Sequence, residues 1–217
     1  MLGNKHAFWQ ALVIALILFW SGILIGVFFE NSRTGELKNF YFDSETDLFD
    51  FELSSEIVYE SNLDCDLIVE KNIFFADKIY LEAIKMEKYD NSNKITEELL
   101  SLHRRYDFLR TLLWKDIIEN KEKCVGEVNT VIYLYQYKNP TITQKTIQGT
   151  MSNFLIDLKE EHNENIILIP IAVDTNIESL EILRELYGLE NFPAIFVNEK
   201  HKFETLDSLG DLERYLD

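Results

Sequence analysis

Residues 191–216 read NFPAIFVNEKHKFETLDSLGDLERYL, and this stretch decides the fold class of the C-terminal part of the chain. Within it, PAIFV (193–197) is a short apolar run that is typical of a buried strand. NEK (198–200) predicts a turn into a short partner strand around 202–205. Residues 208–216 then predict a closing helix, so the stretch as a whole predicts a β-hairpin followed by a helix.

Upstream of this hairpin, strand patterns alternate with helix patterns. VIYLYQY (131–137) is β-branched and aromatic, and IILIPIAVD (166–174) is a continuous apolar run of the kind found in strands covered on both faces. Pro170 lies inside the second run, although proline prefers edge strands because it lacks the N–H donor. Amphipathic helices are predicted at 142–162 and 177–189, the second of them closed by a glycine.

The order β-α-β-α-β-β-α over residues 128–217, with Phe192-Pro193-Ala194 before the third core strand, resembles the thioredoxin fold. The resemblance implies an α/β thioredoxin-like domain at 124–217 and a cis peptide bond before Pro193. It also implies a loop that holds extended peptides, lined by Asn139, Pro140, Thr141, Phe192 and Pro193. The alternative is that this loop only closes the core, with Thr141 or Thr143 capping the next helix.

The catalytic cysteines of thioredoxin-like oxidoreductases are absent from the corresponding position of this sequence. Thioredoxin-like oxidoreductases carry C-x-x-C, or one cysteine, between the first strand and its helix, where the helix N-terminus activates the thiolate. Here the junction reads YKNPTITQ (137–144) and contains no cysteine. The sequence also lacks the common hydrolase, nucleotide-binding and zinc motifs. No catalytic residue, cofactor or metal site is therefore predicted, and enzymatic activity is not expected.

The chain has two cysteines, Cys65 and Cys124. In an oxidising compartment, two cysteines in an otherwise cysteine-free chain predict one disulfide. A redox-active pair and two unrelated buried thiols remain as alternatives.

Residues 30–123 are predicted to be helical, because from residue 31 onward they contain no proline and one glycine. Four-three spacing of largely apolar residues predicts a first helix that continues from the N-terminal segment, a second at about 64–89, and a third that ends near 121. The first seam comprises Leu37, Tyr41, Ser44, Leu48, Phe51, Ser55 and Val58. The third comprises Ile95, Leu99, Leu102, Tyr106, Leu109, Leu113 and Ile117. Together these helices predict an antiparallel bundle or coiled-coil stalk.

Charge is distributed unevenly between these helices. Residues 36–70 carry eleven acidic side chains, whereas the third helix carries His103, Arg104, Arg105 and Arg110. The basic cluster is expected to face the acidic helix or the solvent, and a docking patch for a partner is the alternative.

Residues 7–29, AFWQALVIALILFWSGILIGVFF, contain no charged side chain. At roughly 1.5 Å per residue, this segment spans the roughly 30 Å hydrocarbon core of a bilayer. No small-residue cleavage site precedes Glu30, so an uncleaved anchor is favoured over a signal peptide. A slight excess of positive charge places residues 1–6 in the cytoplasm and the rest outside. Gly22 and Gly26 form a G-x-x-x-G, which can bring two membrane helices close together.

The formal net charge of −17 argues against nucleic-acid binding, which requires a basic surface. The sequence thus predicts a single-pass protein of the cell membrane that contacts lipid through residues 7–29. Outside the cytoplasm it presents a redox-inactive thioredoxin-like domain to a protein partner, a second copy or the cell envelope. The alternative is a membrane-tethered thiol–disulfide oxidoreductase or isomerase that uses Cys65 and Cys124. The whole chain also loosely resembles uncharacterised membrane-anchored proteins of archaea.

Overall fold

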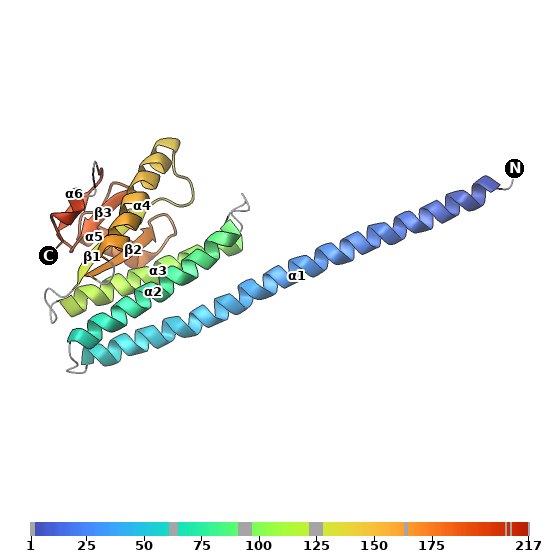
Figure 1. The fold of residues 1–217 in the computed structure, drawn as a ribbon. Coiled ribbons are helices and arrows are strands. Elements are labelled where there is room, and N and C mark those ends of the chain that lie inside the picture. Colours follow the sequence, from blue (N-terminus) through green and yellow to red (C-terminus); the bar gives the residue numbers. More distant parts are fainter. Residues whose placement is uncertain are drawn as a thin grey trace. The chain divides into compact units, whose positions relative to one another are not determined.

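The computed structural model describes residues 3–60, 65–90, 97–121, 128–162, 165–206, 208 and 210–216. The chain divides into two compact units, Met1–Asp50 and Phe51–Asp217. The predicted boundary near residue 124 lies inside the second unit, between its helical part and its α/β part. Helix α1 (Gly3–Glu60) belongs to both units, because it continues without a break across their boundary (Figure 1).

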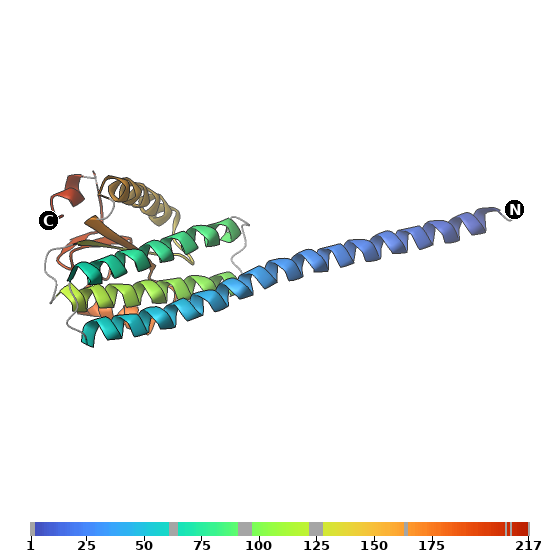
Figure 2. The ribbon, with the colours of Figure 1, turned by 60° about the horizontal axis from the view of Figure 1, so that its bottom comes forward.

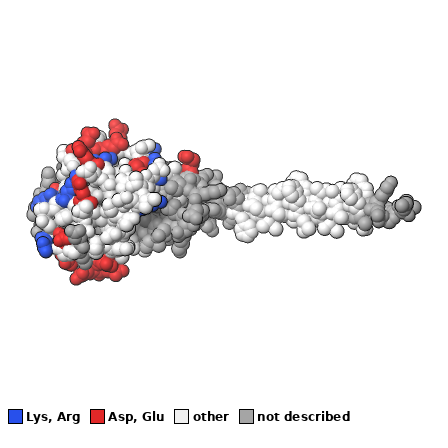
Figure 3. Space-filling model, turned by 90° about the horizontal axis from the view of Figure 1, so that it is seen from above, with Lys and Arg blue, Asp and Glu red and all other residues white. Residues whose placement is uncertain are grey.

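The first unit contains a helix long and apolar enough to cross a membrane. Phe8–Phe29 within α1 has a mean hydropathy of 2.7, and none of it is buried. In Figure 3 the described part of this segment shows no acidic or basic side chain. The predicted membrane-spanning segment is therefore present as an exposed apolar helix that is continuous with the first predicted soluble helix.

The second unit begins with the end of α1, followed by α2 (Cys65–Asp90) and α3 (Glu97–Lys121). Of the first predicted seam, only the side chain of Phe51 lies among the described residues; its ring stacks on that of Phe75 in α2 at 3.5 Å between centroids. Helices α2 and α3 lie side by side (Figures 1 and 2). All described members of the third seam are buried: Leu99, Leu102, Tyr106, Leu109, Leu113 and Ile117. The seventh, Ile95, lies outside the described residues.

The rest of the unit is an α/β arrangement around a four-stranded mixed sheet. In chain order, its elements are β1 (Asn129–Tyr135), α4 (Ile142–His162), β2 (Ile166–Ala172), α5 (Glu178–Leu186), β3 (Ala194–Val197), β4 (His201–Phe203) and α6 (Gly210–Glu213). The strand order is β2-β1-β3-β4, with β2 parallel to β1 and both β3 and β4 antiparallel to their neighbours. The element types are those predicted, but α6 is shorter than the predicted 208–216.

Both faces of the sheet are covered by helices. Val131, Tyr133 and Ile195 pack with Leu155 of α4 and Leu212 of α6. The other face lies against α3, as Figure 2 shows. There the ring of Trp114 meets those of Phe196 in β3 and Tyr187 after α5, with centroids 6.3 and 5.8 Å away. The sheet is thus buried between α4 and α6 on one side and α3 and α5 on the other.

Strand β2 forms one edge of the sheet, which explains its internal proline. The N–H of Val173 donates to the C=O of Tyr135 in β1. The backbone N–H and C=O groups of every second residue, counted back from Ala172, therefore point away from β1. Pro170 is one of these residues, and it has no N–H to expose. The N–H of Ala172 donates to Asp107 Oδ1 at 3.0 Å, and the C=O of Ile166 accepts from Lys159 Nζ at 2.9 Å. Much of the outer edge of β2 is therefore capped by side chains.

The turn between β3 and β4 falls where NEK predicted it. Asn198 and Glu199 adopt φ values of 53° and 54°, and the N–H of Lys200 donates to the C=O of Val197. This geometry is that of a type I′ turn, which suits a hairpin. Lys121 Nζ, at the end of α3, lies 2.8 Å from Glu199 Oε2 and fixes the turn to the helical part of the unit.

Candidate functional site

The loop residues predicted from the thioredoxin resemblance lie at one edge of the sheet. Leu134 near the end of β1 pairs with Ala194 at the start of β3. The segment after β1 and the segment before β3 therefore lie at the same end of the sheet. The expected cis peptide bond between Phe192 and Pro193 is present. Of the five predicted loop residues, Asn139 and Thr141 are exposed, Pro140 and Phe192 are half-buried, and Pro193 is buried.

Thr141 is used by the helix that follows it. Its Oγ1 accepts from the N–H of Gln144 at 3.2 Å, and the side chain of Gln144 accepts from the N–H of Thr141 at 2.9 Å. This reciprocal pair is a capping box at the start of α4. The prediction that Thr141 caps the helix is therefore confirmed, and its hydroxyl is already engaged.

Asp174, in the turn after β2, and Gln148 of α4 fix the loop before α4. The carboxylate of Asp174 accepts from the N–H groups of Tyr137 and Lys138 at 2.9 and 2.7 Å. The amide of Gln148 accepts from the N–H of Gln136 at 3.3 Å and donates to its C=O at 3.0 Å. These backbone donors are therefore occupied within the protein. A ligand at this edge would therefore not bind these three donors, whereas the strongly exposed side chain of Ile142 at the start of α4 is available to it.

A cluster of buried polar residues on α3 lies behind this loop. The ring of His103 stacks on that of Tyr137 at 3.6 Å. Asp107 is fully buried, and its Oδ1 lies 3.4 Å from Arg110 Nη1 while it also accepts from the N–H of Ala172. His103, Asp107 and Arg110, here called the α3 polar cluster, thus join α3 to the ends of β1 and β2.

Burial governs the ionisation of this cluster. It raises the pKa of Asp107 to about 6, against the opposing charge of Arg110. Burial, assisted by Arg110, lowers the pKa of His103 to about 4, although the carboxylate of Asp174 opposes this shift. Burial and the charge of Asp107 also raise the pKa of Tyr135 at the end of β1. At neutral pH the cluster therefore holds a neutral histidine beside an arginine–aspartate pair.

The expected orientation of the basic residues on α3 is wrong for His103 and Arg110. His103 and Arg110 are buried under the sheet edge instead of facing the acidic helix or the solvent; only Arg104 of the four is fully exposed. The signal that distinguishes them is spacing, because His103, Asp107, Arg110 and Trp114 repeat the four-three pattern one residue after the apolar seam. Two adjacent stripes of this kind indicate a helix buried on two sides.

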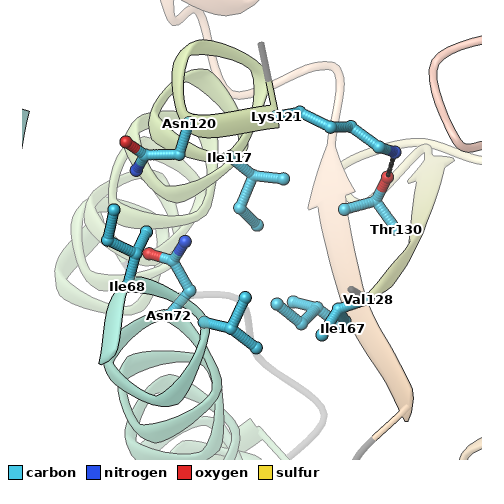
Figure 4. A pocket seen from close by; sticks show the side chains of 9 residues that line it. Ile68, Asn72, Ile117, Asn120, Lys121, Val128, Thr130 and Ile167 are labelled. Carbon is cyan, nitrogen blue, oxygen red and sulfur yellow. Dashed lines mark hydrogen bonds between the residues drawn. The ribbon is translucent and has the colours of Figure 1, made fainter. Parts of the chain in front are cut away.

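A small cavity lies between α2, α3 and the sheet (Figure 4). Its volume is about 30 Å³, and Ile117 and Ile167 contribute to its mainly apolar lining. The amides of Asn72 and Asn120 lie on its helical side (Figure 4). A space of this size suits a buried water and is too small for an organic substrate.

Two residues that line the cavity are close in sequence to the cysteines. Ile68, three residues after Cys65, and Lys121, three residues before Cys124, contribute to its lining. Cys65 is in its disulfide-bonded form. Cys124 lies outside the described residues.

Among the described residues, no three His, Cys, Asp or Glu side chains are arranged to hold a metal ion. Neither protein-family models nor curated proteins match the chain.

Proposed function

We propose that this chain is a single-pass protein of the cell membrane that holds a redox-inactive thioredoxin-like domain outside the cytoplasm for protein interaction or envelope architecture. The observation that carries the proposal is the pairing of an exposed apolar helix, Phe8–Phe29, with a separate compact α/β unit. An apolar helix with no buried face requires an apolar solvent such as a bilayer.

The connection of the elements supports the thioredoxin-like part of the proposal. A β-α-β unit with parallel strands is followed by a helix and an antiparallel hairpin, in the strand order β2-β1-β3-β4. Helices α4 and α6 cover one face, and α5 covers the other together with α3. This is the arrangement that the sequence resemblance implies for residues 128–217.

The β1–α4 junction supports the absence of thiol chemistry. It contains no cysteine, and the N–H groups of Tyr137 and Lys138 donate to the carboxylate of Asp174. What remains for a protein ligand is a side-chain surface that includes Asn139, Ile142 and Phe192. Phe192 is held in place by Arg184, whose guanidinium lies 4.4 Å from its ring centroid.

A crosslinking experiment in native membranes tests the binding role. A photo-crosslinking amino acid at Ile142 is expected to capture a protein partner. The matched control is the same group at Ile182, an exposed apolar position on α5. Equal capture at both positions, or capture at neither, would contradict binding at this edge.

The proposal includes a disulfide between Cys65 and Cys124. The disulfide-bonded state of Cys65 supports it, because the chain has one other cysteine. Such a bond would tie the start of α2 to the segment after α3 and close the helical part beside the cavity.

Thiol labelling tests the orientation. After mild reduction of intact cells, a membrane-impermeant thiol reagent is expected to label Cys65 and Cys124. Protection in intact cells together with labelling after lysis would place the domain in the cytoplasm.

The second candidate function, a thiol–disulfide oxidoreductase, rests on the same two cysteines. Its test compares turnover of a model disulfide by the wild-type protein with turnover by the Cys65→Ser, Cys124→Ser double variant. Equal background rates are expected. Faster wild-type turnover would favour the enzyme.

A further inference from the structure

Helix α2 carries a regular apolar stripe on its exposed side. Leu67, Phe74 and Leu81 are spaced seven residues apart and are 36%, 65% and 59% exposed. The helix is buried through Ile68, Phe75 and Ile79, which lie roughly 100–140° round from Phe74 and already have partners in α1, α3 and the sheet. The three exposed residues, here called the α2 stripe, are not required for that packing. Residues seven apart recur on nearly the same face of a helix, so the α2 stripe offers a neighbouring helix one apolar residue per heptad, half of the apolar set of a full coiled coil.

Opposite charges flank the α2 stripe. At 100° per residue, Glu70 and Asp77 lie roughly 40–60° to one side of Phe74, whereas Lys71 and Lys78 lie roughly 40–60° to the other. One flank is therefore acidic and the other basic, over the same length of helix. A helix that packs on the α2 stripe should therefore carry basic side chains opposite the acidic flank and acidic side chains opposite the basic flank.

We propose that the α2 stripe docks on the α2 stripe of a second copy of this chain, with the two helices parallel and in register. In a parallel two-fold pair, the left flank of one helix faces the right flank of the other, so Lys71 lies opposite Glu70 of the second copy. The half-buried Lys78, which also interacts within its own chain, lies opposite Asp77 of the second copy. An antiparallel pair would place like charges together. Charge complementarity thus selects both the occupant and its direction.

The size of the stripe sets the strength of the contact. A stable interface buries about 800 Å² per partner, more than three side chains on one helix provide. The pair is therefore weak for chains free in solution. Anchoring both copies in one membrane raises their effective concentration, and in this respect the inference rests on the proposed anchor. Parallel pairing suits that arrangement, because both α1 helices then join their α2 helices at the same end of the pair.

The full chain in lipid vesicles provides the test. Donor and acceptor fluorescent proteins at the C-terminus report self-association through energy transfer, measured against protein density. The wild type is expected to associate, and the Phe74→Glu, Leu81→Glu variant is expected to need at least about tenfold higher density, the effect of roughly 1.4 kcal/mol. The matched control is Ile182→Glu with Leu186→Glu, two exposed apolar positions on α5, which should behave as the wild type.

A charge exchange tests the direction of pairing. Lys71→Glu with Lys78→Glu makes both flanks acidic and is expected to weaken association, whereas adding Glu70→Lys and Asp77→Lys should restore it. A monomeric wild type, an unaffected stripe variant, or equal association of the two charge variants would overturn the proposal. Loss of association in Gly22→Leu, Gly26→Leu alone would move the contact to the membrane span and would also overturn it. Vesicle flotation separates the two proposals, because a chain that fails to float contradicts the anchor, whereas a floating monomer contradicts only the pairing.

Discussion

Helix α3 and the segment Phe8–Phe29 of α1 are both long helices rich in large apolar residues, yet they have opposite environments. Tyr106 and Trp114 of α3 are fully buried, whereas no part of the α1 segment is. The α3 helix is buried although it also carries His103, Asp107 and Arg110. Burial therefore follows the spacing of apolar residues and not their abundance. A helix with an apolar stripe can bury that stripe against other elements, whereas a helix that is apolar all round is typical of the core of a large protein or of a membrane span.

The largest change in stability is expected from a substitution in the buried helix α3. Trp114→Ala removes a fully buried ring that contacts Tyr187 and Phe196, and should lower the free energy of unfolding by about 3–5 kcal/mol. Chemical denaturation of the full chain in detergent micelles measures this loss. Phe108→Ala on the same helix is the control; because Phe108 is 41% exposed, its replacement should cost much less. Equal losses would mean that the helix does not pack through its Trp114 side.

The apolar segment should be sensitive to charge in a different way. Leu18→Arg places a cation near the middle of Phe8–Phe29, where it costs about 2.5–3.5 kcal/mol of insertion. Alkaline extraction of membranes should then release the variant, whereas Leu18→Val should stay bound. The folding of Phe51–Asp217 should be unchanged in both. Retention of the arginine variant would contradict a bilayer environment for this segment.

The α3 polar cluster should add a pH dependence that the apolar segment lacks. The pKa of Asp107 is raised from 3.8 to about 6, so the folded protein binds more protons than the unfolded chain between these values. The contribution of Asp107 to the free energy of unfolding should therefore fall as pH rises from about 4 to 6, by roughly 1–3 kcal/mol. His103, whose pKa is lowered to about 4, contributes a rise over nearly the same range, so the Asp107 contribution is the difference between the wild type and Asp107→Asn.

Asp107→Asn should remove this contribution, because the amide does not titrate and its oxygen can still accept from the N–H of Ala172. Denaturation at pH 4.5 and pH 7 measures the difference from the wild type. Asp157→Asn, at an exposed position on α4, is the control and should keep the wild-type slope. An unchanged slope in Asp107→Asn would show that the carboxyl ionises normally.

The smallest effect belongs to the solvent-exposed side of α3. Lys115 Nζ and Glu119 Oε2 lie 2.8 Å apart, with side chains 51% and 42% exposed. Such a pair contributes about 0.3–0.5 kcal/mol, so Glu119→Gln should change stability by no more than this. A loss of stability above about 1 kcal/mol in the same denaturation measurement would contradict the expectation that solvent screens this exposed ion pair.

The sequence was sufficient where a single period governs a segment. The four-three seam predicted the end of α3, and alternating strand and helix patterns predicted the element types from β1 to β4. Pro170 was a difficulty for the strand prediction at 166–174, and the edge position of β2 resolves it. The helix expected at 208–216 is reduced to Gly210–Glu213, where Leu212 is the buried anchor.

The candidate site was predicted less completely, because its contacts join distant segments. Asp174 and Gln148 hold the β1–α4 loop, and nothing local in the sequence links either residue to that loop. Nor did composition reveal that Asp107 reaches Ala172. A basic cluster on a helix usually faces solvent, and only the agreement of its spacing with the neighbouring seam shows otherwise.

The capped outer edge of β2 bears on how this sheet meets other chains. An open strand edge is a template on which another chain can add a strand. At this edge, Pro170 has no N–H, and the N–H of Ala172 donates to the carboxylate of Asp107. The hydroxyl of Thr175 donates to the C=O of Ala172 at 3.1 Å, and Lys159 Nζ donates to the C=O of Ile166. A second chain that approaches the sheet at β2 therefore finds few free backbone groups, so sheet extension is disfavoured at this edge.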